Sequence, residues 1–325
     1  MKLGVFTVLF ASLPFEEMLD KVKDAGLKAV EIGTGAYPGN SHCPIDELLE
    51  DKEKRDEYLK QVADRGLIIS GFSCHGNPLS PDTAFATKSD VDLRKTIQLA
   101  SLCKVPVVNC FSGLPGTPFD SKDSVTPNWP VVPWPPEHID VYNWQWEEKI
   151  IPYWKEIGRL ATESNVKIAI ELHGGFSVHS PYTMLKLREA TCEAIGANFD
   201  PSHLWWQGID PVAAIKILGA AGAIHHFHAK DTIIDQDNVS MHGLLSTISY
   251  GEVAHRSWTF RSVGCGHDLK VWSDMMSALR VVGYDYVVSI EHEDPLMSID
   301  EGFNRAVTNL NSVLIHDMPT DMWWA

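Results

Sequence analysis

The sequence predicts an eight-stranded α/β barrel, the (β/α)8 or TIM barrel, on the basis of three observations. Short runs rich in β-branched and aromatic residues alternate with longer amphipathic segments about eight times along the chain. The runs lack a strict apolar–polar alternation, which is typical of strands covered on both faces. The chain has 325 residues, 44% of them hydrophobic, and barrels of this size commonly form one domain. We therefore expect a single domain over residues 1–325, with a doubly wound sheet as the alternative.

The expected strands follow one another with helical segments between them. The first begins in MKLGVFTVLF, which has the apolar content of a leader peptide but runs into an amphipathic helix without a small-residue cleavage site. Apolar residues recur at helical spacing in residues 16–27 and 90–103. The strands are expected at residues 3–8, 28–33, 67–76, 105–113, 167–172, 195–200, 223–230 and 286–293.

Two connections, after the fourth and seventh strands, are too long for ordinary loops. Residues 112–143 contain many prolines, which disfavour regular helix or sheet, while Trp129 and Trp134 offer apolar surface for burial. Residues 231–268 carry Asp, Ser and Gly with aromatic residues between them. These long loops either only cover the barrel top, or they shape a substrate pocket or dock a partner.

The charge balance excludes some classes of partner. With 27 Lys and Arg against 43 Asp and Glu, the formal charge is −16, which disfavours nucleic acid because phosphate contacts need clustered cations. No stretch of about eighteen residues is apolar and free of charge and proline, so the sequence predicts no membrane span. The six cysteines form no Cys-x-x-Cys pair, which favours reduced structural thiols and a cytoplasmic protein.

Each of the last four expected strands ends in a potential metal ligand. Glu171, Asp200 and Glu291 end the fifth, sixth and eighth strands, and the seventh carries His226 and His228 on one face. Active sites of α/β barrels gather at the carboxyl ends of the strands. We favour His228 as the ligand because it lies nearer the strand end, and expect His226 to be structural.

This set of oxygen and nitrogen ligands suits a divalent metal of intermediate hardness. Mn²⁺ fits best, with Co²⁺, Mg²⁺ or Zn²⁺ as alternatives. Without a cation, three carboxylates in an apolar barrel mouth would repel one another, and at least one would have to hold a proton. Any single strand-ending Glu or Asp can instead be a helix cap or an ion-pair partner, so the hypothesis depends on the whole set.

Further polar side chains are expected around the same mouth. His173 lies on the same side of its strand as Glu171 and is either a proton-transfer base or structural. His203, three residues after Asp200, either contacts substrate or is structural. Lys230 either neutralises an oxyanion or is an ordinary solvated lysine. Glu293 shares the face of Glu291, whereas His292 points the opposite way.

Three more residues have two interpretations each. Trp205, in HLWWQG, either stacks on the apolar face of a sugar or packs in the core. His75 and Glu31 either line the other half of the mouth or have structural roles.

The ordered motifs ELH, FDPSH, HFHAKD and IEHED resemble the xylose-isomerase-like barrel superfamily of sugar isomerases and epimerases. The resemblance covers nearly the whole chain. It implies that Glu171, Asp200, His228 and Glu291 bind a divalent metal, usually Mn²⁺, which grips adjacent oxygens of a carbohydrate. A base then removes a proton next to a carbonyl.

Further segments resemble the larger, catalytic subunit of bacterial C-glycoside deglycosylases. They are EIGTGAYPGNSHCP, SCHGNPL, the Trp/Pro-rich insertion and WQWEEKIIPYW. This resemblance implies a 3-oxo-glucoside substrate, His173 as the base, and a small β-rich second subunit in a hetero-oligomer. The aglycone would leave by β-elimination.

Other functions remain open at this point. In a sugar or inositol isomerase or epimerase, Glu171 and Glu291 would be the proton-transfer pair. A non-catalytic barrel could bind sugar or hold a partner, although the intact ligand set and His173 count against it. A barrel endonuclease would need more histidines at the mouth and a basic groove, which the charge balance disfavours.

Overall fold

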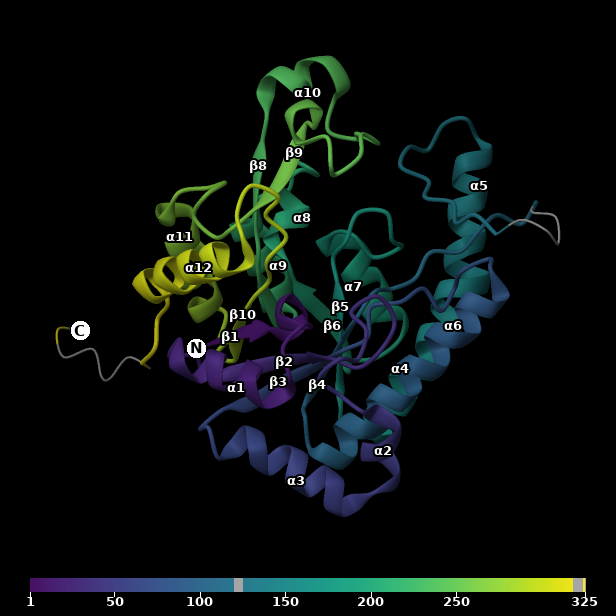
Figure 1. The fold of residues 1–325 in the computed structure, drawn as a ribbon. Helices are drawn as coiled ribbons and strands as arrows, with labels where there is room; N and C mark the ends of the chain where they lie inside the picture. Colours follow the sequence, from purple (N-terminus) through teal and green to yellow (C-terminus); the bar gives the residue numbers. More distant parts are fainter. Residues whose placement is uncertain (120–124, 318–323, 325) are drawn as a thin grey trace.

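The computed structural model describes residues 1–119, 125–317 and 324. Its main strands are β1 (Lys2–Phe6), β2 (Ala29–Gly33), β3 (Ile68–Ser73), β4 (Val107–Cys110), β5 (Lys167–Glu171), β6 (Ile195–Phe199), β7 (Ile224–Ala229) and β10 (Val287–Ile290). They form a closed parallel barrel in the order β1-β10-β7-β6-β5-β4-β3-β2 (Figure 1). The predicted fold class is confirmed, and each strand overlaps its predicted range.

Helices alternate with the strands along the chain, and most of them cover the outside of the barrel (Figure 1). They are α1 (Phe15–Asp24), α2 (Ile45–Glu50), α3 (Lys52–Ala63), α4 (Thr83–Cys103), α5 (Glu137–Trp144), α6 (Ile151–Glu163), α7 (Pro181–Ala190), α8 (Pro201–Trp205), α9 (Pro211–Ala220), α10 (Gln236–His242), α11 (Leu269–Val281) and α12 (Ile299–Val313). The longest, α4, starts where the Asp82 side chain accepts hydrogen bonds from two backbone amides, and it ends at Lys104 in the left-handed conformation.

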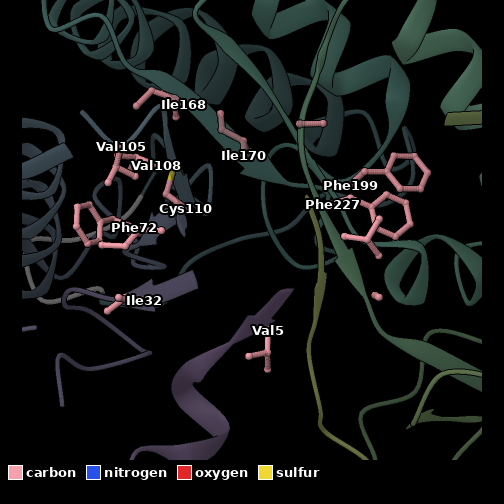
Figure 2. Close-up of a cluster of buried hydrophobic side chains, with 14 of the residues drawn as sticks. Val5, Ile32, Phe72, Val105, Val108, Cys110, Ile168, Ile170, Phe199 and Phe227 are labelled. Atoms are coloured by element: carbon pink, nitrogen blue, oxygen red, sulfur yellow. The ribbon is translucent and has the colours of Figure 1, made fainter. Parts of the chain in front are cut away.

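The apolar core lies between the strands and the helices. Figure 2 shows part of it, with Phe72 on β3, Ile170 on β5, Phe199 on β6 and Phe227 on β7, all fully buried. The rings of Phe199 and Phe227 stack with centroids 5.5 Å apart. Successive residues of a strand point to opposite faces. Since these four side chains point outward, the residues next to them in each strand point into the barrel.

The inward-facing neighbours are polar in the part of the barrel nearest the site. They include Glu31, Asn109, Asn198, His226 and Ser289, and every one of them is fully buried. The strand pairing shifts register between Val30 and Glu31 and again between Ala197 and Asn198. Such irregularities commonly lie next to active sites, where they re-aim a side chain. Here each is followed directly by a buried polar residue.

The connection after β7 contains regular structure that the sequence did not predict. Its strands β8 (Asp231–Ile234) and β9 (Trp258–Arg261) form a two-stranded antiparallel sheet. Between them lie α10 and a short 3-10 helix, Val253–His255. The β8–β9 pair and α10 extend away from the barrel (Figure 1).

The connection after β4 also differs from expectation. Helix α5 begins at Glu137, inside the range expected to lack regular structure, because Pro135 and Pro136 precede the helix and leave its hydrogen bonds intact. A π-helical turn, Gln145–Ile150, joins it to α6. Trp129 packs against an aromatic cluster, whereas the Trp134 side chain is 74% exposed, so the expectation that both would be buried is wrong for Trp134.

The cysteines match the expected structural role. All six are free, and Cys43, Cys74, Cys103 and Cys110 are buried. Burial raises the pKa of each of these four thiols, which keeps them protonated and unreactive. In the described part of the chain, no helix is both long and apolar enough to cross a membrane.

Candidate metal and substrate site

The four predicted ligands meet at the carboxyl ends of their strands. Glu171 is the last residue of β5, Asp200 follows β6 and caps α8, His228 lies on β7, and Glu291 follows β10. One ligand atom from each residue lies within 4.8 Å of the others. We call these four residues the ligand quartet. The shared level of parallel strand ends explains why residues far apart in sequence converge here.

The atoms of the ligand quartet have the character of a cation site. Asp200 Oδ2, His228 Nδ1 and Glu291 Oε2 are buried and have no well-oriented hydrogen-bond partner among the described residues. His228 Nδ1 lies 2.9 Å from Glu291 Oε2 and 3.4 Å from Glu171 Oε2. A nitrogen lone pair facing carboxylate oxygens at these distances requires a proton or a metal ion between them. The residues therefore fit a divalent metal.

The electrostatics of the ligand quartet agree with this interpretation. Burial raises the pKa of Asp200 to about 7, against the opposing effect of Lys230. Burial also acts to raise the pKa of Glu291, but Lys230 and His228 lower it to about 2. Burial acts to lower the pKa of His228, yet Glu31 and Glu291 raise it well above its usual value. A metal ion would displace the protons held by Asp200 and His228.

Lys230 is buried at the same place and is not a solvated lysine. Its Nζ lies 3.1 Å from Asp200 Oδ2, 3.0 Å from Glu291 Oε2 and 3.0 Å from Glu293 Oε2. The Phe260 ring lies under the ammonium group, 4.7 Å from Nζ to the ring centroid. Despite the burial, the neighbouring carboxylates raise the pKa of Lys230, so it stays positively charged.

Three histidines surround Glu171. His75 Nε2 lies 3.1 Å from Glu171 Oε2, and His203 Nε2 lies 3.1 Å from Glu171 Oε1. The ring of His173 lies 3.9 Å from that of His203, centroid to centroid. The predicted site residues His75, His173 and His203 are therefore all brought to the ligand quartet.

His173 is held in a defined orientation and protonation state. Its Nδ1–H donates to the Gly174 carbonyl at 2.5 Å, which leaves Nε2 without a proton. Burial, together with the neighbouring His203, lowers its pKa to about 3. The imidazole is neutral at pH 7, the form that can accept a proton.

A pocket of about 280 Å³ opens above these residues. Its polar lining residues are His75, His173 and Lys230 together with Glu171, Glu291 and Glu293. Its other lining residues are mostly apolar: Phe6, Val8, Tyr37, Pro38 and Phe111. A small polar molecule with an apolar substituent would match this mixed lining.

Trp205 is not brought to the ligand quartet. Its ring stacks on His267 at 3.9 Å and meets Trp272 edge-on, on another side of α8. The next residue, Trp206, lies by the site instead, since a Cβ built on Gly174 would be only 2.2 Å from its Cη2 atom. Trp206 stacks on Trp258 of β9. Adjacent residues in a helix point about 100° apart, so only one of the two tryptophans can face the site. The sequence alone could not show which one, because it does not fix how the helix is rotated about its axis.

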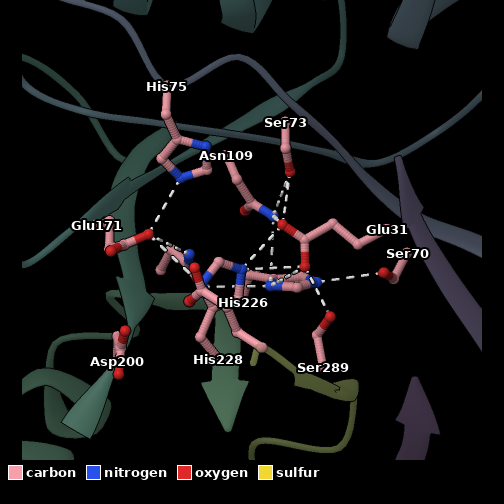
Figure 3. Close-up of polar contacts among 12 residues, drawn as sticks. Glu31, Ser70, Ser73, His75, Asn109, Glu171, Asp200, His226, His228 and Ser289 are labelled. Carbon is pink, nitrogen blue, oxygen red and sulfur yellow. Dashed lines mark hydrogen bonds and ion pairs between the residues drawn. The ribbon is translucent and has the colours of Figure 1, made fainter. Parts of the chain in front are cut away.

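On the far side of His228 lies a buried carboxylate, Glu31 (Figure 3). His228 Nε2 lies 2.8 Å from Glu31 Oε1. Glu31 also accepts hydrogen bonds from Ser73, Asn109 and Ser289. Sequence reasoning considered Glu31 for the mouth and missed the other three. The available signal was a polar residue at an inward-facing position of a strand that is otherwise apolar.

The closed barrel and the ligand quartet at its strand ends together indicate the family of proteins to which the chain belongs. The chain belongs to the xylose isomerase-like TIM barrel family, whose model matches residues 19–310. The uncharacterized protein YfiH of Bacillus subtilis (strain 168) is 38% identical over 317 residues, which cover 97% of this chain and 99% of YfiH.

Two solved structures illustrate the fold. The probable 3-DHS dehydratase AsbF of Bacillus anthracis, involved in petrobactin synthesis, superposes with a TM-score of 0.66 at 18% identity, covering 96% of this chain and 99% of its own. The 3-keto-D-glucoside 4-epimerase YcjR of E. coli superposes with a TM-score of 0.64 at 11% identity, covering 96% and 99%. At these identities the similarity establishes the shared fold.

Proposed function

We propose that this protein is a divalent-metal-dependent enzyme that removes a proton next to the carbonyl group of a keto sugar or keto glycoside. The observation that carries the proposal is the convergence of the ligand quartet beside one pocket, which Glu171 and Glu291 line together with a neutral histidine, His173. A site with an electrophilic cation and an adjacent neutral base is suited to forming an enolate from a ketone.

Each residue has a role in this chemistry. The ligand quartet would hold the metal, and a bound Mn²⁺ or similar ion supplies positive charge that stabilises a developing oxyanion. His173 accepts the proton at Nε2, because its Nδ1–H is held by the Gly174 carbonyl. Lys230 adds a fixed positive charge, and His75, which lines the pocket, contacts the substrate from the Glu171 side. His203 does not line the pocket and holds Glu171 from behind.

We further propose that the substrate is a 3-oxo-glycoside, most closely a 3-oxo-C-glucoside, and that the enolate collapses by β-elimination. His173 takes the proton from C2, and the electron pair forms the C1–C2 double bond while the bond from C1 to the aglycone breaks. The C3 carbonyl is restored, and the departing aglycone anion takes up a proton, either the one that His173 removed from C2 or one from water. The mostly apolar lining residues Phe6, Val8, Tyr37, Pro38 and Phe111 support a substrate with an apolar aglycone.

The two solved neighbours support the general chemistry from different directions. One is named as a dehydratase and the other as an epimerase of a 3-keto-D-glucoside. Both an elimination and an epimerisation next to a ketone can start with loss of the adjacent proton.

A second candidate is therefore a sugar epimerase or isomerase. The observation that favours it is that Glu171 and Glu291 both line the pocket and approach the same nitrogen, His228 Nδ1, from different strands. One carboxylate could remove a proton and the other return it to the opposite face of the sugar.

We also propose a small β-rich second subunit. Support comes from apolar side chains that the two long connections expose: Phe119, Trp134, Met241, Leu245 and Tyr250, between 56% and 80% exposed. Exposed apolar groups of this kind are common at protein interfaces.

The test is mass-spectrometric detection of aglycone released from a 3-oxo-C-glucoside in D₂O with Mn²⁺, with and without the candidate small subunit. Glu171→Ala and His173→Gln should abolish release, whereas His255→Gln, at an exposed histidine, should not. Deuterium entering the sugar without release of aglycone would make the protein an epimerase or isomerase. If there is neither release nor exchange with any of the four divalent metals, the enzyme proposal is wrong.

A further inference from the structure

The fully buried carboxylate of Glu31 does not line the pocket, and the proposed chemistry does not use it directly. Its two oxygens collect donors from four other strands of the barrel. Ser73 Oγ lies 2.5 Å and Asn109 Nδ2 2.8 Å from Oε1, and Ser289 Oγ lies 2.7 Å from Oε2. The fourth donor is His228, whose Nε2 lies 2.8 Å from Oε1 and 3.0 Å from Oε2.

We propose that Glu31 is a positioning residue: it holds the proton of His228 on Nε2 and thereby presents the Nδ1 lone pair to the metal bound by the ligand quartet. This inference rests on the proposed function, because it requires a metal at the ligand quartet. A carboxylate opposite a ligating imidazole fixes the tautomer and the ring orientation and makes the ligating nitrogen more basic.

The geometry of His228 supports this role on both sides of the ring. Among the carboxylates of the described residues, Nε2 contacts Glu31, while Nδ1 faces Glu171 at 3.4 Å and Glu291 at 2.9 Å. The Phe6 ring stacks on the imidazole with centroids 5.6 Å apart, which limits rotation of the ring. A flip about χ2 would move Nδ1 away from the ligand quartet and leave Glu31 without the Nε2–H donor.

Glu31 could alternatively hold a second cation, since Glu31, His226 and His228 also offer atoms within 4.8 Å of one another. The hydroxyl and amide donors argue against this. Ser73, Asn109 and Ser289 already occupy the oxygens of Glu31, and a cation there would have to displace them. A carboxylate surrounded by donors is an acceptor for the histidine and not an open metal ligand.

Further buried polar side chains lie between Glu31 and a second member of the ligand quartet, Glu171. Asn109 lies 3.4 Å from His226 Nδ1, which lies 3.3 Å from Asn198 Oδ1, and Asn198 Nδ2 donates to Glu171 Oε2 at 3.4 Å. Both asparagines and His226 are fully buried. Glu31 thus directly positions His228, and through this chain of side chains it is connected to Glu171.

The first measurement uses the unmodified protein. Long-range ¹H–¹⁵N spectra of Zn²⁺-loaded protein labelled in histidine should show the His228 proton on Nε2 and zinc on Nδ1, with the signal assigned by its loss in His228→Gln. Zinc on Nε2 with the proton on Nδ1 would overturn the proposal, whatever the variants do.

The second measurement is metal affinity by calorimetric titration with Mn²⁺ and Co²⁺. Glu31→Gln removes the charge and one acceptor oxygen, and Glu31→Asp keeps the charge but withdraws it from His228. Both should weaken binding about 10- to 100-fold, the range typical for such outer partners. Glu57→Gln, at an exposed residue outside the proposed site, should bind the metals like the wild type.

The outcomes separate the two hypotheses. If the wild type binds no divalent metal, the metal-dependent function fails. If the wild type binds metal and a folded Glu31→Gln binds it equally well, the positioning role of Glu31 fails. Thermal unfolding of every variant checks that the fold is retained, and if both Glu31 variants unfold, the spectrum of the wild type still decides the matter.

Discussion

The two faces of the barrel strands have opposite chemistry although both are buried. Outward-facing residues such as Phe72, Phe199 and Phe227 are apolar and pack against helices, whereas inward-facing residues such as Glu31 and His228 are polar or charged. Burial of the first kind stabilises the fold, while burial of the second kind is unfavourable unless every group is paired. Side chains that stabilise the fold therefore lie on the outer face of the strands, and side chains that carry the proposed chemistry lie on the inner face of the same strands.

The largest expected effect is on the inner face. His173→Gln removes the neutral base and should lower kcat by about 10²- to 10⁴-fold with little change in the free energy of unfolding. Aglycone release or deuterium exchange measures the rate, and chemical denaturation measures the stability. A variant with normal kcat would show that His173 is not the base.

A substitution on the outer face should lower the stability of the fold and leave metal binding unchanged. Phe199→Ala leaves a cavity next to Phe227 and should lower the free energy of unfolding by about 3–5 kcal/mol. At a temperature where the variant is folded, its affinity for Mn²⁺ should match the wild type. A large loss of metal affinity in the folded variant would contradict the division between the two faces.

The pH dependence of metal binding sharpens the description of the inner face. Glu31 and Glu291 raise the pKa of His228 well above its usual value against the effect of burial, so His228 holds a proton at pH 7 until a metal displaces it. Burial raises the pKa of Asp200 to about 7, so this carboxyl is mostly protonated only below that pH. Affinity should therefore fall as the pH is lowered, by about tenfold per pH unit for the His228 proton and more steeply below about pH 7, where Asp200 also gives up a proton. Titrations at pH 8, 7 and 6 test this, and an affinity independent of pH would rule out proton displacement.

The smallest expected effect is at Trp205. Because its ring stacks on His267 and not in the pocket, Trp205→Phe should leave KM and kcat unchanged and destabilise the fold by less than about 1.5 kcal/mol. Trp206→Phe is the matched comparison, since Trp206 packs over Gly174 beside His173. A raised KM in Trp205→Phe would restore it as a substrate contact.

Much of the fold and the ligand quartet could be predicted from the sequence. Strands with β-branched residues have a local signature, and parallel strands bring their carboxyl ends to one level, so Glu171 and Asp200 could be placed together without a structure. The outward and inward positions also followed from the period of two, which placed His226 and His228 on one face.

The rest depended on tertiary contacts. A single Asn or Ser in a strand, such as Asn109 or Ser289, is ambiguous until its partner across the barrel is known. The β8–β9 pair forms between segments separated by more than twenty residues with no tight-turn signal. The difference between Trp205 and Trp206 depended on the rotation of a short helix, which no local pattern fixes.

The hydrogen-bond network around Glu31 limits which substitutions this protein can accept during evolution. Its donors come from β3, β4, β7 and β10, so replacing the carboxylate alone would leave several buried donors unpaired at once. Tyr37 lines the pocket and its side chain is 62% exposed, so a substitution there leaves no such set of buried donors unpaired. We therefore expect new substrates to arise from substitutions at the rim of the pocket, such as at Tyr37, while Glu31 and its four donors are retained together.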